Sequence, residues 1–265
     1  MAKALIYPKF ALTHIKDPNR FWAIPLLGGL TKIIILIPVF IEFWFLAMYV
    51  FVISIINSFI VLFTGSYWRH CFNVTTGLMK LAAKTGLFFS GLTNKYPGFD
   101  LQIHDNWQLE FTLPQKPNRY FAIPLLGGLS RIILLLPYAV YSQVIARGSG
   151  VGMVISSVPV LFSGKYPEST YEMGRDAIRL SLRQGVYFAG ISDTYPSWYI
   201  SMNHKAIKII LIIVGALMIL GQSSARHERF NHQNYNNNGD YGRNYMPSRH
   251  LQPPNNTTPQ TNGVF

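Results

Sequence analysis

A long stretch of apolar residues near the start of the chain restricts the possible folds more than any other feature. Between Phe21 and Phe63, a run of 43 residues, only Lys32 and Glu42 are charged. About 18 consecutive apolar residues already indicate a membrane span. Charged residues make up 13% of the chain, about half of their share in soluble domains. The sequence therefore predicts an integral membrane protein, and a buried helix of a large soluble protein is the weaker alternative.

The region around this stretch occurs twice. The block at 18–38 (PNRFWAIPLLGGLTKIIILIP) returns at 117–137 (PNRYFAIPLLGGLSRIILLLP), 99 residues later. We interpret this as a tandem duplication, with a first copy at 18–99 and a second copy at 117–198. Shorter matches with the same shift pair VLFTGSY at 61–67 with VLFSGKY at 160–166, and NKYP at 94–97 with DTYP at 193–196.

The two copies differ unevenly along their length. Positions 17–38 share 15 identities of 22 with the second copy, whereas positions 39–60 share 4 of 22. A lipid-facing helix needs only apolar side chains, so its identities drift. The first block must meet a narrower requirement, such as close backbone packing at Gly28-Gly29 and Gly127-Gly128.

Each copy is predicted to hold an apolar run followed by an amphipathic helix at the membrane interface, at 71–92 and 168–191. The fold class is an all-α polytopic membrane protein with two such repeats and one further span. The remaining segments are an N-terminal arm at 1–17, a polar connector at 100–116, a C-terminal transmembrane helix at 203–222 and a disordered Asn- and Pro-rich tail at 223–265.

Charge placement favours a transmembrane hairpin in each copy. Residues 1–38 carry five basic residues and residues 64–136 carry seven, and the positive-inside rule places both flanks in the cytoplasm. A hairpin with its tip between Thr31 and Glu42, turning at Pro38 or Pro137, satisfies that rule. The alternative is a helix on the membrane surface followed by one crossing of about 25 residues.

Several basic residues are candidates for contact with the membrane interface. Arg20, Lys32, Arg119 and Arg131 are predicted as interfacial anchors, with Lys32 and Arg131 snorkelling to the far interface. A second group, Arg175, Arg179 and Arg183, repeats at every fourth position and is a candidate for binding anionic phospholipid headgroups. The alternative for this group is a solvated face balanced by Glu172 and Asp176.

Besides Lys32 and Arg131, two charged residues lie inside the apolar runs. Arg147 falls in the second run, and Glu42 is the only acidic residue in either run. Ionisable residues within a membrane are candidates for function, and an Arg147–Glu42 pair between the copies is one hypothesis. The alternative is that residues 148–150 (Gly-Ser-Gly) break the helix and let Arg147 reach water.

The motifs occur in one order in both copies: Arg-x-x-x-Ile-Pro, an apolar run, Leu-Phe-Thr/Ser-Gly-x-Tyr, a basic helix, and Asp/Asn-x-Tyr-Pro. In this order the chain resembles a bacterial integral membrane family classed as a domain of unknown function. The resemblance implies a bacterial membrane location and no particular activity. The first copy departs from it at Trp68, where the second has Pro167. The residues on which the resemblance rests are Arg20, Pro25, 62–67, Tyr96 and Pro97 in the first copy, and Arg119, Pro124, 161–167, Tyr195 and Pro196 in the second.

The net charge of +12 indicates anionic membrane lipids as partners, with a homo-oligomer or a membrane protein as further partners. Nucleic acid is not expected, because no compact basic face carries aromatic stacking platforms. A single cysteine, Cys71, excludes an internal disulfide. His227 and His232 do not indicate a metal site, because their spacing in a tail predicted to be disordered is weak evidence for metal ligands.

No phosphate-cradling Gly-Lys-Ser/Thr loop, His-Glu-x-x-His or Gly-x-Ser-x-Gly motif is present. The sequence therefore predicts no catalytic residue, no cofactor and no metal. We expect a non-enzymatic structural or accessory protein of the bacterial cytoplasmic membrane that organises lipid or a partner membrane complex. The alternative is a small channel or transporter using the charge at Arg147, since internal repeats and intramembrane charges are transporter features.

Overall fold

The computed structural model of the chain describes residues 7–14, 17–24, 27–103, 107–124 and 126–222. It divides into a unit Met1–Ile219 and a unit Leu220–Phe265. The elements below belong to the first unit, apart from the last residues of the C-terminal helix. The tail predicted to be disordered, with His227 and His232, lies outside the described residues.

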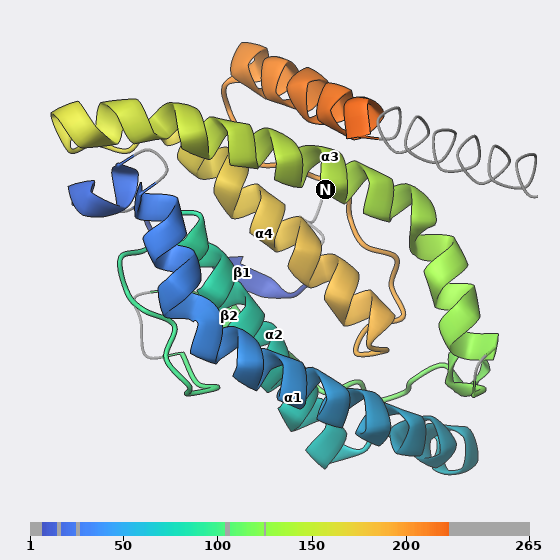
Figure 1. Ribbon diagram of the computed structural model, residues 1–265. Coiled ribbons are helices and arrows are strands. Elements are labelled where there is room, and N and C mark those ends of the chain that lie inside the picture. Colours follow the sequence, from blue (N-terminus) through green and yellow to red (C-terminus); the bar gives the residue numbers. More distant parts are fainter. Residues whose placement is uncertain (1–6, 15–16, 25–26, 104–106, 125, 223–265) are drawn as a thin grey trace, which may run out of the picture. The chain divides into compact units, whose positions relative to one another are not determined.

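The fold is mostly helical (Figure 1), as predicted. Adding 99 to the bounds of β1, η1, α1 and α2 reproduces the bounds of β2, η2, α3 and α4. In chain order the elements are β1 (Lys9–Ala11), the 3₁₀ helix η1 (Arg20–Ala23), α1 (Leu27–Thr64), α2 (Arg69–Phe89), β2 (Gln108–Glu110), the 3₁₀ helix η2 (Arg119–Ala122), α3 (Leu126–Ser163) and α4 (Glu168–Phe188), followed by a C-terminal helix, Lys205–Gln222.

Three of these helices are long and apolar enough to cross a membrane: α1, α3 and the C-terminal helix. The predicted hairpins are wrong, because α1 and α3 are each one continuous helix of 38 residues. Pro38 and Pro137 lie inside these helices. Proline removes one backbone hydrogen bond and bends a helix, but a reversal needs a loop of turn-forming residues. The stretch from Thr31 to Glu42 contains none besides Pro38.

Glycines with positive φ end both long helices. Gly65 (φ 71°) follows α1 and Gly164 (φ 67°) follows α3, and the left-handed conformation at this position is the common C-terminal cap of a helix. Close approach explains two other glycines. A Cβ at Gly28 would lie 2.4 Å from the Trp22 carbonyl oxygen, and one at Gly127 would lie 2.2 Å from that of Phe121. The predicted close backbone packing is therefore found at Gly28 and Gly127 but not at Gly29 and Gly128, where a Cβ would meet nothing within 4 Å.

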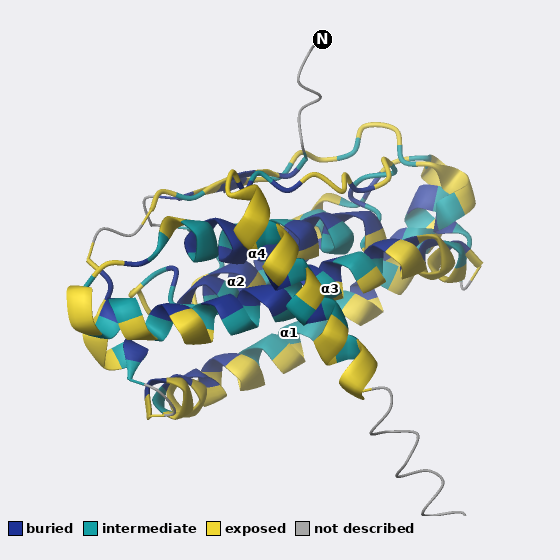
Figure 2. Cartoon of the chain, turned by 90° about the horizontal axis from the view of Figure 1, so that it is seen from above, coloured by how far each residue is buried: buried dark blue, intermediate teal, exposed yellow. Residues whose placement is uncertain are grey.

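The first unit is layered. α1 packs on α2, α3 packs on α4, and α2 contacts α4. In Figure 1, α1 and α3 lie in front of α2 and α4, with the strands behind them. Figure 2 shows the same arrangement from above. Exposed positions line the outer surface of the long helices. These exposed positions are largely apolar, including Ile34, Phe45 and Phe51 in α1 and Ile133 and Val154 in α3.

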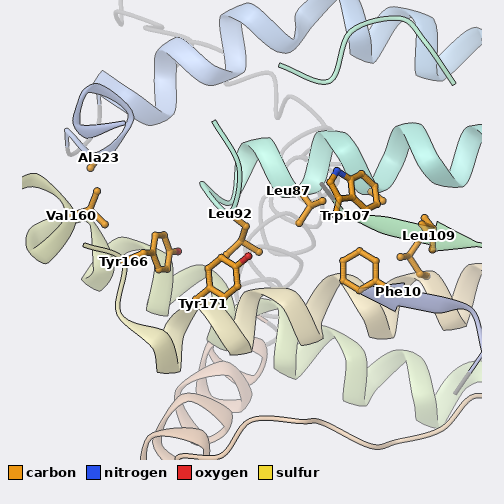
Figure 3. Packing of buried hydrophobic residues seen from close by; sticks show 11 residues of the cluster. Phe10, Ala23, Leu87, Leu92, Trp107, Leu109, Val160, Tyr166 and Tyr171 are labelled. Atoms are coloured by element: carbon orange, nitrogen blue, oxygen red, sulfur yellow. The ribbon is translucent and has the colours of Figure 1, made fainter. Parts of the chain in front are cut away.

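The two strands lie in the arm and the connector and pair with each other. β1 and β2 are antiparallel, and Phe10 lies opposite Leu109. Both side chains are buried in a cluster that also holds Trp107, Leu87 of α2 and Tyr171 of α4 (Figure 3). The core therefore joins residues from both halves of the chain.

Corresponding residues of the two copies make corresponding contacts with the opposite copy. The Tyr67 hydroxyl donates to the Ala189 carbonyl at 3.0 Å, and the Tyr166 hydroxyl donates to the Ser90 carbonyl at 3.4 Å. Tyr166 follows Tyr67 by 99 residues, and Ala189 follows Ser90 by the same number. Each copy thus places the tyrosine of its Gly-x-Tyr turn on the C-terminal end of the other copy's shorter helix.

Candidate functional site

The most densely bonded polar cluster joins α4 to the segment that follows it, residues 197–203. At its centre is Asp176, which is 1% exposed. Its carboxylate accepts hydrogen bonds from the Ser201 amide at 2.6 Å and the Ser201 hydroxyl at 2.8 Å. Arg179 donates to the same carboxylate at 3.0 Å. Hydrogen bonds to a charged partner are shorter and stronger than bonds between neutral groups.

The neighbouring charges extend this cluster in both directions along α4. Arg175 donates to the Ser201 hydroxyl at 2.6 Å, and Glu172 accepts from the Asn203 amide at 3.1 Å. Arg179 also reaches β1, where its Nη2 donates to the Phe10 carbonyl at 3.3 Å. The cluster therefore ties three segments together: α4, the following segment and the first strand.

Arg183 completes the row. Its Nη1 donates to the carbonyls of Ser197 and Tyr199, at 2.9 and 3.0 Å. The side chain is 2% exposed, and its Nε and Nη2 have no partner among the described residues. Burial lowers the pKa of Arg183, an effect that nearby Tyr138 and Asp176 oppose. An arginine guanidinium stays protonated in proteins at neutral pH.

These contacts correct the prediction for Arg175, Arg179 and Arg183. The stripe exists at the expected helical spacing, but it faces the chain's own segment at 197–203. It forms neither a lipid-facing surface nor a solvated one. The available sequence signal was the pair of serines, Ser197 and Ser201, in the segment that follows Tyr195-Pro196.

The first copy repeats this docking with lysines. Lys84 donates to the Asp100 carbonyl at 2.6 Å, as Arg183 does to Tyr199, and these positions are related by 99 residues. Lys80, which corresponds to Arg179, donates to the Gln102 side chain at 3.4 Å. The helix of each copy therefore holds the segment that follows its Tyr-Pro motif.

The basic residues predicted to snorkel lie inside the protein instead. Lys32 is 5% exposed and donates to the Phe89 carbonyl at the end of α2, at 3.3 Å. Arg131 donates to the Tyr187 carbonyl near the end of α4 and pairs with Asp193 at 2.5 Å. Cations at a helix C-terminus are favoured by its free carbonyls and dipole. These two residues therefore cap helices and are not interfacial anchors.

The other two predicted anchors, Arg20 and Arg119, are exposed. Each guanidinium lies over the glycine that ends the other copy's long helix. A Cβ at Gly164 would lie 3.0 Å from Arg20 Nη2, and one at Gly65 would lie 2.7 Å from Arg119 Nη2. The start of each copy is thus beside the end of the other copy's long helix.

The structure does not bring Glu42 and Arg147 together. None of the ion pairs between described residues joins them. Glu42 lines a shallow hollow of about 420 Å³ with Phe45, Tyr49 and others. Its carboxylate interacts electrostatically with Lys84. The Glu42 Oε2 and Arg147 Nε atoms are buried without a hydrogen-bond partner in the described part of the chain.

The helix break predicted beside Arg147 is also absent, because α3 continues through residues 148–150. Gly148 serves packing instead. A Cβ at Gly148 would lie 2.4 Å from the Leu211 carbonyl oxygen, and one at Gly215 would lie 2.2 Å from that of Val144. Small residues let apolar helices approach this closely. The two glycines were the available sequence signal, and they mark where the C-terminal helix crosses α3.

No group of three or more His, Cys, Asp or Glu side chains that could hold a metal ion occurs among the described residues. The polar clusters found in those ranges are occupied by contacts within the chain. What the arrangement can do chemically is hold segments in place and present an apolar outer surface.

Residues 29–100 match the model of a domain of unknown function (DUF4389). The match covers most of the first copy and agrees with the resemblance to a family without an assigned function. No curated protein and no solved structure matches the chain.

Proposed function

We propose that the protein is a non-enzymatic membrane protein that organises lipid or holds a partner membrane complex, and that its location is the bacterial cytoplasmic membrane. The observation that carries the proposal is the contrast between its two kinds of surface. Apolar side chains of α1 and α3 face outward, whereas the charges of α4 are used inside the protein. Exposed apolar surface on this scale marks a membrane or protein contact.

The arrangement of the two copies supports a scaffold. We infer that a tandem duplication produced an internal two-fold assembly, because the strand pairing and the tyrosine contacts are reciprocal between the copies. In such an assembly the same surface patch is used on both sides. Each copy completes the other, and the product carries two equivalent apolar helices.

Purification of the full chain from bacterial membranes in mild detergent tests this function. We expect the chain in the membrane fraction after carbonate washing, with anionic phospholipid retained in native mass spectrometry. A chain that is released by carbonate and carries no lipid would contradict the proposal.

A second candidate is a small channel or transporter, favoured by the two partnerless buried atoms, Glu42 Oε2 and Arg147 Nε, in apolar helices. Ion flux in proteoliposomes separates the two functions. Flux through the wild-type chain that is lost in Arg147→Ala and retained in Lys208→Ala would establish transport and overturn the scaffold. Equal, background flux in all three proteins is the scaffold's expected result.

A further inference from the structure

We propose that α1 and α3 lie along the membrane within one leaflet instead of crossing it, and that the partner of their outer surface is the acyl-chain region of that leaflet. This placement deepens the proposed membrane function and rests on it. It assigns the strands and their connecting segments to the water-facing side of the same leaflet.

Helix length is the first argument. A helix of 38 residues is about 57 Å long at ~1.5 Å per residue, whereas the hydrocarbon core of a bilayer measures about 30 Å. Fitting a straight helix of 57 Å into 30 Å requires a tilt of about 58°, and tilts of spanning helices reach about 40°. Even the part of α1 that follows Pro38, about 39 Å long, fits only at the upper end of that range. An upright α1 would leave nearly half of its apolar length in water.

A single layer of helices does fit one leaflet. A helix with its side chains is about 10–12 Å thick, and one leaflet supplies about 15 Å of hydrocarbon. Exposed apolar side chains occur along the whole of α1, from Leu30 through Trp44 to Phe63. In α3 they occur in two stretches, from Leu129 to Val140 and from Val154 to Phe162. Neither helix has a polar end that would emerge from the membrane.

The neighbours of α3 give the second argument. α4 lies antiparallel along α3, since Ser156 bonds Thr170 at 2.5 Å and Ser142 bonds Gln184 at 2.9 Å. The charge cluster around Asp176 is therefore level with the middle of α3. If α3 crossed the bilayer, that cluster would be carried to the middle of the membrane.

The strand pair would be carried there as well. Lys9 and Glu110 form an ion pair at 3.2 Å, and their side chains are 61% and 58% exposed. An exposed charge near the centre of a bilayer costs about 2.5–3.5 kcal/mol even on insertion scales. With α1 and α3 in one leaflet, the strands lie on the opposite side of the α2–α4 layer (Figures 1 and 2) and reach water.

The distribution of basic residues agrees with this placement. Both flanks of each apolar run are basic, which places both on the cytoplasmic side. A helix that lies along the membrane returns its two ends to the same side without a hairpin. The C-terminal helix, of 18 residues and about 27 Å, is then the element whose length matches one crossing.

Cysteine labelling of the full chain in its native membrane tests the placement. Cys71 is buried, so the unmodified chain reports the background. Asp17→Cys and Ser66→Cys flank α1, and Lys116→Cys and Lys165→Cys flank α3 at positions 99 residues further on; all four sites are exposed. An impermeant maleimide is applied to intact spheroplasts and to inverted vesicles.

We expect all four variants to react in inverted vesicles and none of them in spheroplasts. Reaction of Asp17→Cys and Ser66→Cys from opposite sides would show that α1 crosses the membrane, which overturns this placement and leaves the membrane function intact. Recovery of the chain in the soluble fraction would overturn the proposed function and this placement together.

Discussion

Phe10 and Leu109 lie opposite each other at the centre of the antiparallel strand pair, and they are separated by 99 residues, the same shift that relates the two copies. A residue that pairs with its own counterpart lies on the axis that relates two halves. The contacts of α4 with the segment at 197–203 and of α2 with residues 100–102 are arranged around this pair.

Asp176→Asn should destabilise the protein strongly. The substitution removes the charge that Arg179 and the Ser201 groups bind, and breaking a buried ion pair costs about 3–5 kcal/mol. Glu110→Gln is the matched control, because its exposed pair with Lys9 is worth about 1 kcal/mol or less. Thermal unfolding in detergent compares the two, and equal shifts in Tm would contradict an internal role for the cluster.

Arg131→Met should also lower stability, by about 3 kcal/mol, because Asp193 and the end of α4 lose a buried cation. If Arg131 were an interfacial anchor, its replacement would instead reduce membrane binding and leave unfolding nearly unchanged. Arg69→Met, at an exposed position, serves as the control. Denaturation and vesicle binding, measured on the same samples, distinguish the two roles.

Gly148→Ala should weaken the packing of the C-terminal helix on α3. The new Cβ would lie 2.4 Å from a backbone carbonyl oxygen, and overpacking of this kind costs about 1–3 kcal/mol. Gly150→Ala, two residues away, meets nothing within 4 Å and should be neutral or slightly stabilising. Limited proteolysis before Lys205 reads out release of the helix, and similar cleavage in both variants would rule out the close crossing.

Stability should decline between pH 10 and 12, in part because of Tyr166. Burial raises the pKa of Tyr166 to about 12, whereas an unfolded tyrosine titrates near 10. In that interval the folded chain retains a proton that the unfolded chain has lost, so the stabilisation present below pH 10 is lost as the pH rises. Tyr166→Phe should make the decline shallower by on the order of 2 kcal/mol, while Tyr120→Phe, an exposed control, should not. Unfolding at several pH values measures the slope.

Much of the architecture could be read from the sequence, because the repeated motifs keep a constant shift and the apolar runs have a clear length. The path of α1 could not be predicted from the sequence. Pro38 indicates a bend, and only the packing of α1 on α2 decides whether a bend becomes a turn.

The orientation of charged faces was harder still to predict. Arg175, Arg179 and Arg183 form a stripe at helical spacing, but periodicity does not say what covers a face. Here the cover is an irregular segment whose backbone carbonyls and Ser201 hydroxyl accept the bonds. Lys32 and Arg131 were misplaced for a related reason, since the helix ends that they cap are more than 50 residues away in sequence.

The depth of spin labels along α1 distinguishes a helix that lies within one leaflet from a helix that crosses the membrane. Ile37 and Ile55 are both exposed and lie 18 residues apart, which is five helical turns and about 27 Å on one face of the helix. With nitroxides attached to Ile37→Cys and Ile55→Cys in the full chain in anionic vesicles, we predict equal depths within one leaflet. Depths that place the two labels in opposite leaflets would contradict the account.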